Sequence, residues 1–510
     1  MDGTGSHYAS VADVVVVGDR IAAVGPWVAE RDAGPDTQMV IDARGKVVAP
    51  GFIDVHVHSE IALLGGRDQL AGVRQGVTTN LLSPDGFGWA PLPYPRGREM
   101  WAYTQFAYGL TELAPNWPTV RQYLDMFPGN TPANIYPQVP HGAVRLRALG
   151  WECRKATASE RDCMVDAVDE WVDAGAGALS IGLDYQPGIH ADMDELVTLA
   201  KAVGACRGIV AAHMRNQMLG RTAAMAEMVD VARRAEVPVH ISHERVDGET
   251  NELFEQIGRD GTDLTFDSYL YPAGMTHLAL WLPPEVQAGS LGDMLERMRD
   301  RRVRECSLPH LSERLGVAGD QIIGYTASGR FIGLRLAQAA GTEHKSLADF
   351  AYDLILSEGG LEACTMPWLA SELQKEAILR QTATCPRMLV ASDGIYNIPH
   401  PHPRAYGCFA QILGKYVREL GLLSLEEAVY KMSGFPARRF GLGDRGQIAE
   451  GMAADLVVFD PEIVAARSTW DRPLASASGI EWVIVNGQPV IARGVPTGRL
   501  PGRVLRRSAP

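Results

Sequence analysis

The sequence predicts a (β/α)₈ barrel of the TIM type, accompanied by a small β-sandwich domain built from both ends of the chain. Three observations predict this fold. Apolar, strand-like runs alternate with helical stretches through the middle of the chain, while both ends contain strand-like runs only. Histidine and aspartate residues follow several of the middle runs, where barrel enzymes carry their active sites. We expect the small domain to comprise residues 1–50 and 441–510 and the barrel residues 51–440. An insertion is expected near 284–345, where the alternation breaks.

Composition limits the class of protein. With 510 residues, of which 46% are hydrophobic, the chain can bury a large core. Its net charge of -13 argues against nucleic acid or an anionic membrane as a partner. No apolar run reaches the roughly 18 residues of a membrane span, and the first residues lack the features of a signal peptide. The seven cysteines include no Cys-x-x-Cys pair, which predicts reduced thiols and a cytoplasmic protein.

Short strands and tight turns mark the two ends of the chain. Near the start, residues 12–24 are β-rich and turn at Gly18-Asp19. Near the end, residues 454–460 and 480–491 are β-rich, and the second run contains Asn486-Gly487, a strong hairpin signal. These two ends are therefore predicted to form the small β-sandwich.

The barrel begins at residues 50–58, PGFIDVHVH. Side chains alternate faces along a strand, so His56 and His58 point the same way. Two imidazoles on one face at a strand end form a natural pair of metal ligands. Asp54 is expected to accept a hydrogen bond that orients one of the rings.

Further strand-like runs follow, separated by helical stretches such as 195–203 and 223–235. The runs are 76–82, 177–183, 208–213, 237–243, 263–267 and 387–393. Three of them end in His213, His243 and Asp393. Each residue alone has an ordinary interpretation, as a hydrogen-bonded rim histidine or a turn aspartate. Because the carboxyl ends of barrel strands converge, their joint occurrence with His56 and His58 predicts a metal site.

Histidine and carboxylate ligands suit Zn²⁺, which polarises a carbonyl and lowers the pKa of bound water to about 7. Asp393 can accept a proton from such a water and pass it to a leaving amine. A carboxylated lysine bridges the two ions in many barrels of this kind, but none of the seven lysines of this chain ends a barrel-type strand. A different bridge is needed if two metal ions bind.

Ten segments together resemble the amidohydrolase superfamily and, within it, the N-acyl-D-amino-acid deacylase (D-aminoacylase) family, over nearly the whole length. They are residues 50–58 (PGFIDVHVH), 76–79 (GVTT), 141–145 (HGAVR), 182–188 (GLDYQPG), 213–215 (HMR), 242–243 (SH), 267–274 (DSYLYPAG), 392–394 (SDG) with 402–407 (HPRAYG), and 451–460 (GMAADLVVFD).

The resemblance implies roles for individual residues. His213 and His243 resemble the ligands of a tightly held zinc ion, and His56 and His58 those of a second, weaker site. Asp393 resembles the general base and acid. It also implies that Tyr185 polarises the scissile carbonyl and that Tyr269 and Arg404 hold the substrate carboxylate, which an arginine can grip through two parallel hydrogen bonds.

Three substitutions depart from the family pattern. Asp85 stands where the family has a cysteine ligand, and a carboxylate can ligate or bridge metal ions and favours harder ions such as Mn²⁺. Asp85 could instead only cap the Pro84-Asp85-Gly86 turn. Arg245 replaces a family lysine and keeps its charge. Met275 replaces a serine, so the usual carboxylate pocket is altered. Family members also carry one more strand before residues 2–5, so either the start lies upstream or the small domain lacks an edge strand.

We therefore expect a zinc-dependent amidohydrolase that cleaves the amide bond of an N-acyl-D-amino acid, a small substrate bearing a carboxylate. One alternative is an amidohydrolase of another amide or of a cyclic, hydantoin-like imide. Another is a metal-binding protein without catalysis, which the presence of Asp393 argues against.

Overall fold

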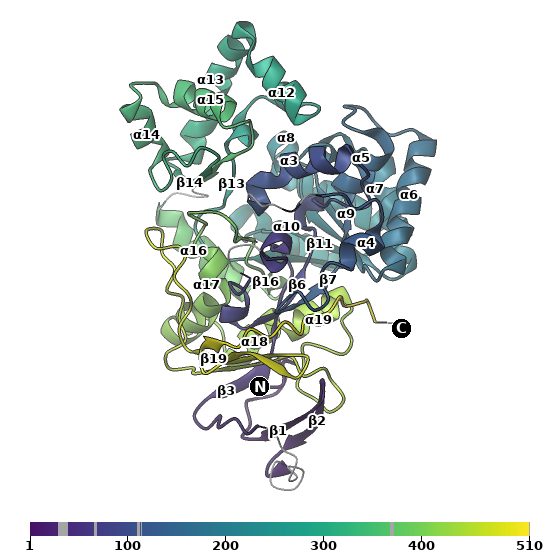
Figure 1. The fold of residues 1–510 in the computed structure, drawn as a ribbon, viewed down its shortest axis with the longest axis vertical. Helices are drawn as coiled ribbons and strands as arrows, with labels where there is room; N and C mark the ends of the chain where they lie inside the picture. The colour runs from purple at the N-terminus through teal and green to yellow at the C-terminus, as the bar shows by residue number, and fades with distance from the viewer. Residues whose placement is uncertain (29–38, 66–68, 110–112, 114, 368–371, 509–510) are drawn as a thin grey trace.

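Parallel strands form the centre of the molecule (Figure 1). The computed structural model describes residues 1–28, 39–65, 69–109, 113, 115–367 and 372–508. The central strands are β4 (Phe52–Asp54), β6 (Val77–Leu81), β7 (Asn134–Tyr136), β8 (Val139–Pro140), β9 (Ala178–Gly182), β10 (Ile209–His213), β11 (Val239–Ile241), β12 (Leu264–Ser268) and β16 (Met388–Val390). They pair in the orders β4-β6-β7 and β8-β9-β10-β11-β12-β16, always in parallel.

A further parallel pair, β5 (Val57–His58) with β17 (Gly394–Ile395), links the first part of the barrel to the last. Every residue of these barrel strands is buried, as expected for parallel strands covered on both faces. The predicted barrel is confirmed, with β6, β9, β10, β11, β12 and β16 inside the expected runs or within one residue of them.

Helices and short helical turns connect the strands. The helices are α2 (Glu60–Leu63), α3 (Arg96–Tyr108), α4 (Val120–Leu124), α5 (His141–Leu149), α6 (Ala158–Asp173), α7 (Met193–Ala205), α8 (Asn216–Leu219), α9 (Arg221–Ala235), α10 (Gly248–Arg259), α16 (Glu372–Thr384), α17 (Arg404–Gln411), α18 (Leu425–Met432) and α19 (Gly434–Phe440). The turns are η1 (Val73–Gln75), η2 (Pro84–Gly86) and η3 (Gly188–His190), and the π-helix η5 (Ile412–Glu419) continues α17. Sequence signals set several starts: Thr157 and Glu160 form a capping box at α6. The helical stretches expected at 195–203 and 223–235 lie within α7 and α9.

An insertion between β12 and β16 carries its own antiparallel sheet, in the order β13-β15-β14. Its elements are β13 (Thr276–His277), η4 (Leu278–Trp281), α11 (Pro284–Gln287), α12 (Leu291–Met298), α13 (Arg301–Ala318), β14 (Ile322–Thr326), α14 (Leu336–Thr342), α15 (Leu347–Ser357) and β15 (Ala363–Met366). Its helices lie at the top of Figure 1, at the opposite end of the molecule from the sheets formed by the chain ends. The insertion was expected near 284–345, and its strands extend it to 276–366.

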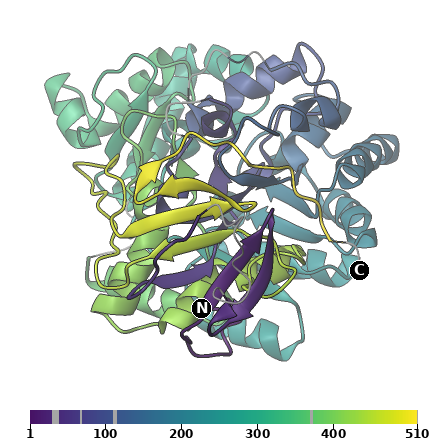
Figure 2. The same ribbon diagram turned by 60° about the horizontal axis from the view of Figure 1, so that its bottom comes forward.

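The two chain ends form antiparallel sheets that share a small core (Figure 2). The hairpin of β1 (Asp13–Val17) and β2 (Arg20–Gly25) lies beside a five-stranded sheet in the order β21-β20-β19-β18-β3. That sheet consists of β3 (Val47–Pro50), β18 (Leu456–Phe459), β19 (Ile480–Val485), β20 (Gln488–Ala492) and β21 (Val495–Pro496). Side chains such as Ile21 and Leu456 meet between the two sheets.

The hairpin predicted at Asn486-Gly487 is confirmed, with φ of 47° and 76° at its two turn residues. We propose that residues 1–50 and 441–510 form one domain and residues 51–440 the other. Among the described helices, none combines the length and apolar character needed to cross a membrane.

Candidate metal centre

Four histidines and two aspartates meet at the carboxyl ends of the barrel strands. His56 and His58 lie in and just before β5, His213 ends β10, and His243 follows β11. Asp85 lies in η2 after β6, and Asp393 follows β16. Asp85, His243 and Asp393 have φ of 55°, 40° and 46°, a left-handed conformation that is uncommon outside glycine. Such backbone strain concentrates at functional sites.

Asp85 lies at the middle of this group and faces histidines on both sides. Its Oδ1 is 3.5 Å from His56 Nε2, 3.7 Å from His213 Nδ1 and 3.8 Å from His243 Nε2. Its Oδ2 is 3.6 Å from His58 Nε2. The two oxygens of one carboxylate therefore face different histidines.

Most of these atoms are spaced as metal ligands are, and only His213 Nδ1 and His243 Nε2 lie within hydrogen-bond distance of each other among the distances given for this group, at 2.8 Å. Two ligands about 2.0–2.1 Å from a tetrahedral zinc ion lie roughly 3.3–3.4 Å apart, close to the separations around Asp85. Buried polar atoms normally have hydrogen-bond partners, yet His56 Nε2 and Asp85 Oδ1 have none among the described residues. The donor atoms form three overlapping groups, each within 4.8 Å: His56, His243 and Asp393; His56, His58 and Asp85; and Asp85, His213 and His243. The residues present are suited to a binuclear metal centre.

Opposite charges set the protonation of this group. Burial opposes charge on Asp85, but the neighbouring histidines, His56 foremost, outweigh burial and hold the pKa of Asp85 well below its usual range. Burial likewise opposes protonation of His56, yet Asp85, Asp267 and Asp393 raise its pKa to about 10. In the metal-free protein a histidine proton balances carboxylate charge, and a cation would take over that role.

Asp393 is held by Arg404 on the side away from Asp85. Its Oδ1 lies 3.5 Å from His58 Nε2 and 3.7 Å from His56 Nε2, while its Oδ2 lies 2.8 Å from Arg404 Nη2. Arg404 Nε also donates to the Asp393 carbonyl at 2.7 Å. The guanidinium carbon stacks 4.3 Å from the centre of the Tyr269 ring. Arg404 Nη1 has no hydrogen-bond partner among the described residues and can donate to a ligand, while Nη2 is engaged in the ion pair with Asp393.

Arg245 and Met275 are the other residues expected to bind substrate, besides Arg404 and Tyr269. The guanidinium of Arg245 is buried, its Nε has no partner among the described residues, and burial lowers its pKa. Met275 packs against Gly324 of β14, where its methyl group occupies the space of any side chain at position 324. A role of Met275 in substrate binding stays a prediction.

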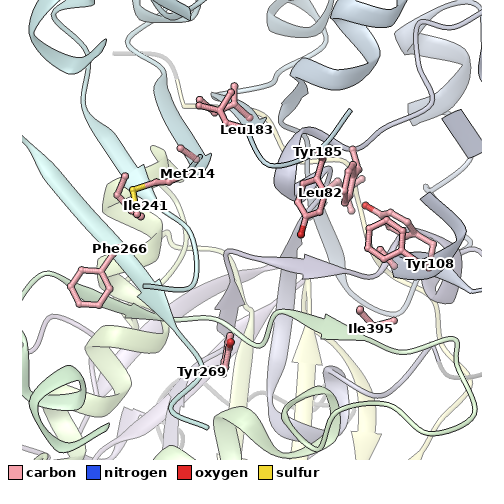
Figure 3. Packing of buried hydrophobic residues seen from close by; sticks show 14 of the residues in the cluster. Leu82, Tyr108, Leu183, Tyr185, Met214, Ile241, Phe266, Tyr269 and Ile395 are labelled. Carbon is pink, nitrogen blue, oxygen red and sulfur yellow. The ribbon is translucent and has the colours of Figure 1, made fainter. Parts of the chain in front are cut away.

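Tyr185 reaches the metal centre from the loop after β9. Its ring centre lies 4.7 Å from that of His213 and 4.9 Å from that of Phe87. Burial raises the pKa of its phenol, and the nearby carboxylates of Asp85, Asp184 and Asp393 raise it further, so the phenol keeps its proton. Tyr185 and Tyr269 both belong to the buried cluster drawn in Figure 3.

Two aspartates that sequence reasoning did not assign hold the histidines in place. Asp184 Oδ2 lies 3.3 Å from His213 Nε2, while His213 Nδ1 lies 2.8 Å from His243 Nε2 and 3.7 Å from Asp85 Oδ1. Asp267 accepts from the His243 backbone N–H at 2.8 Å and contacts His240 Nε2 at 3.0 Å. Asp184 follows one apolar run and Asp267 ends another. A charged residue at the end of a predicted strand was therefore the signal that could have identified them.

The expected role of Asp54 is wrong. Its carboxylate accepts from the Ser392 backbone N–H at 3.0 Å, from the Ser392 hydroxyl and from the His56 backbone N–H at 3.4 Å, and it has no hydrogen bond with an imidazole among the described residues. Asp54 instead fixes the segment that presents Asp393. The carboxylate nearest the ring of His56 on its Nδ1 side is Asp267, at 3.8 Å.

Glu60 connects the histidine strand to the Asp85 turn and was also missed. Its Oε1 accepts from the Ser83 backbone N–H at 2.6 Å, two residues before Asp85. Burial raises the pKa of Glu60 to about 7. Because Glu60 follows His58 by two residues, it fixes the turn relative to that ligand.

Comparison with known proteins identifies the chain. A model of the amidohydrolase family matches residues 39–491, most of the chain. The chain belongs to the amidohydrolase family. Members of this family hydrolyse C–N bonds, and the cluster of histidines and aspartates described above is the part of this member suited to the metal ions.

Relatives with known activity are similar over nearly the full length. The chain is 33% identical to an N-acyl-D-glutamate deacylase and 34% identical to a D-aminoacylase, both from Alcaligenes xylosoxydans xylosoxydans, with 98% of this chain and 93% and 94% of the relatives covered. A solved N-acyl-D-glutamate deacylase from Bordetella bronchiseptica, complexed with zinc and a phosphonate inhibitor, is 31% identical, with a TM-score of 0.83 over 99% of this chain and 97% of the other. A D-hydantoinase from a Bacillus species, 14% identical with a TM-score of 0.57 over 98% of this chain and 96% of the other, shares the fold.

Proposed function

We propose that this amidohydrolase is a zinc-dependent deacylase of N-acyl-D-amino acids, releasing a carboxylate and the free D-amino acid. One observation carries the proposal: Arg404 contacts the Asp393 carboxylate beside the metal-binding group through Nη2, at 2.8 Å, and its Nη1 has no partner among the described residues. An amide substrate that ends in a carboxylate can therefore be held at Arg404 while its amide bond lies at the metal. The names and similarity of the full-length relatives support the D configuration.

Five residues would hold metal: His56, His58, Asp85, His213 and His243. A bound zinc ion polarises the amide carbonyl and activates a water molecule for attack. The two oxygens of Asp85 face His58 and the other three histidines separately, which supports Asp85 as a bridge between two ions. Such a carboxylate bridge also favours harder ions such as Mn²⁺ beside zinc.

The other residues act on the substrate. Asp393 would accept a proton during attack and deliver it to the departing amine. The Tyr185 phenol, kept protonated by its surroundings, would donate a hydrogen bond to the oxygen that gains charge. Arg404, Arg245 and Tyr269 would bind the substrate carboxylate, and Met275 would also contact the substrate. The seven cysteines form no disulfide, which supports a cytoplasmic location.

A substrate panel tests the proposal. Zinc-loaded protein should hydrolyse N-acetyl-D-amino acids at least about tenfold faster than their L isomers, and N-acetyl-D-amino-acid amides, which lack the carboxylate, more slowly still. Faster opening of a hydantoin or dihydropyrimidine ring would assign the protein to another reaction of its family. If the amides were hydrolysed as fast as the free acids, the proposed binding of the substrate carboxylate would be rejected.

A further inference from the structure

His277 is a polar side chain that the proposed chemistry leaves unused. It ends β13 in the insertion, opposite Cys364 of β15, and is 1% exposed. Neither ring nitrogen has a hydrogen-bond partner among the residues that the structure describes. A neutral imidazole offers one donor and one acceptor, and buried polar atoms are nearly always paired. The ring of His277 can therefore both donate and accept a hydrogen bond with a ligand.

The surroundings of His277 connect it to the metal centre. Its ring packs edge-on against Phe106, with ring centres 4.6 Å apart, and lies 6.0 Å from the ring of Tyr185. Tyr185 in turn lies 4.7 Å from the ring of His213. The imidazole is therefore separated from a metal-binding histidine by a single side chain, the phenol placed at the scissile carbonyl.

The environment of His277 is uncharged. Burial alone lowers the pKa of His277 to about 3, and no charged group among the described residues contributes to that shift. The ring packed against His277 is that of Phe106, which is apolar. Arg404, the arginine proposed to bind the substrate carboxylate, instead contacts Asp393. A substrate carboxylate beside His277 would be buried without a cation, which is costly.

We propose that His277 selects substrates that carry an uncharged hydrogen-bonding group, a carboxamide or a hydroxyl, where the substrate passes Tyr185. This inference rests on the proposed deacylase function and narrows its substrate class. The group can belong to the amino-acid side chain or to the acyl chain. Sequence identity does not choose among the relatives, since deacylases named for D-glutamate and D-aspartate and a D-aminoacylase are 33%, 32% and 34% identical. From His277 we expect an N-acyl-D-glutamine to be a better substrate than the N-acyl-D-glutamate.

Matched substrate pairs and variants of one residue test the inference. For the side chain, kcat/KM is compared for the N-acetyl derivatives of D-glutamine, D-glutamate and D-methionine, which are similar in length. For the acyl chain, N-glycolyl-D-methionine is compared with N-propionyl-D-methionine, which replaces the hydroxyl with a methyl group. The proteins are wild type, His277→Leu, His277→Gln and the control His310→Leu on α13. Zinc content and thermal unfolding are measured for each.

The wild type should prefer the hydrogen-bonding member of one pair by about tenfold or more, the discrimination expected of one buried hydrogen bond. His277→Leu should bring that ratio close to one while zinc content stays unchanged, His277→Gln should retain part of the preference, and His310→Leu should match the wild type. The pair that responds identifies the source of the group.

Equal ratios in wild type and His277→Leu for both pairs, or a wild-type preference for D-glutamate, would overturn the inference and leave the deacylase function standing. If the zinc-loaded wild type hydrolyses none of the five compounds, the deacylase function itself fails and the inference falls with it. Because every zinc content is measured, neither result can be attributed to loss of metal.

Discussion

At the scale of single residues, Asp393 and Arg404 share one ion pair that sets what each can do. Burial would raise the pKa of Asp393, but Arg404 and the nearby histidines outweigh burial and lower it, so the carboxylate is ionised in the resting site. An ionised carboxylate can accept a proton from water. A carboxylate-bearing substrate that engages Arg404 would weaken the pair and make Asp393 a stronger base during turnover.

Replacing Asp393 with asparagine tests this role. Asp393→Asn keeps the shape of the side chain but cannot carry a proton, so we expect kcat to fall by roughly 10²–10⁴. Zinc content and the unfolding temperature should stay near those of the wild type. The control is Asp260→Asn, which removes an exposed ion pair with Arg233 and should leave turnover unchanged. Near-normal turnover of Asp393→Asn would show that another group is the base.

Asp85 is one of the three residues at which this chain departs from the family pattern, and its two oxygens face different histidines. Asp85→Ala should lose at least one equivalent of metal and lower kcat/KM by about 10²-fold or more, since even outer partners of ligands cost 10–100-fold. Asp85→Cys should keep zinc but bind Mn²⁺ more weakly than the wild type, because a thiolate is a soft ligand. Metal analysis after dialysis measures both. Equal metal content and activity in Asp85→Ala would reject the ligand role and leave Asp85 as a turn residue.

At the scale of elements, the Asp85 turn fits tightly between its neighbours. The Gly86 N–H donates to the Ser180 hydroxyl at 3.1 Å, and the Asp85 carbonyl packs on Gly182 at the end of β9. A Cβ atom at Gly182 would lie 2.1 Å from that carbonyl oxygen, far inside contact distance. The end of β9 therefore determines where η2, and with it Asp85, can lie.

Gly182→Ala should displace the turn through its backbone. We expect lower zinc content, at least about a tenfold loss of kcat/KM and a lower unfolding temperature, since overpacking costs roughly 1–3 kcal/mol. Gly316→Ala is the matched control, because it adds the same methyl group in α13 with nothing within 4 Å. That change should stabilise the protein by about 0.4–1 kcal/mol. Unchanged metal content in Gly182→Ala would show that the turn tolerates the shift.

The sequence predicted the elements whose signal lies within a short stretch of neighbouring residues. His56 and His58 could be assigned because alternation along a strand puts both on one face, and β6, β9, β10 and β12 fall in strand-like runs of the sequence or within one residue of them. Strands β7 and β8 were missed because each is short and Pro137 interrupts them. The contacts of Asp184, Asp267 and Glu60 join elements distant in sequence, so the local sequence could not show which groups these residues contact. His277 was missed because a two-residue strand carries no periodicity.

At the scale of the whole molecule, the metal centre joins strands from the beginning, middle and end of the barrel. Without a cation, the carboxylates and histidines of this centre are buried together with unpaired atoms. A metal ion that binds only the folded state stabilises it, by about 2.7 kcal/mol at 100 times its Kd. The centre should therefore contribute to global stability as well as to catalysis.

Removing the metal should lower the unfolding temperature. Protein treated with a chelator and dialysed should unfold a few degrees below the untreated protein, and added Zn²⁺ should restore the difference. Calorimetry with metal analysis on the same samples measures this. The His310→Leu protein, treated identically, controls for effects of the chelator on the insertion. Superimposable curves with and without metal would mean that the site contributes nothing to the folded state.

The pairing of β5 with β17 also bears on when the enzyme can form during synthesis. Ser392 donates to Asp54, a residue 338 positions earlier in the sequence. The sheet that contains β3 also includes β19, β20 and β21, which lie in the last tenth of the chain. Contacts so distant in sequence form slowly, since a long loop must close first. A nascent chain would hold His58 on an unpaired strand until β17, at residues 394–395, had left the ribosome. Metal capture should be among the last events of maturation, and truncated chains should accumulate without it.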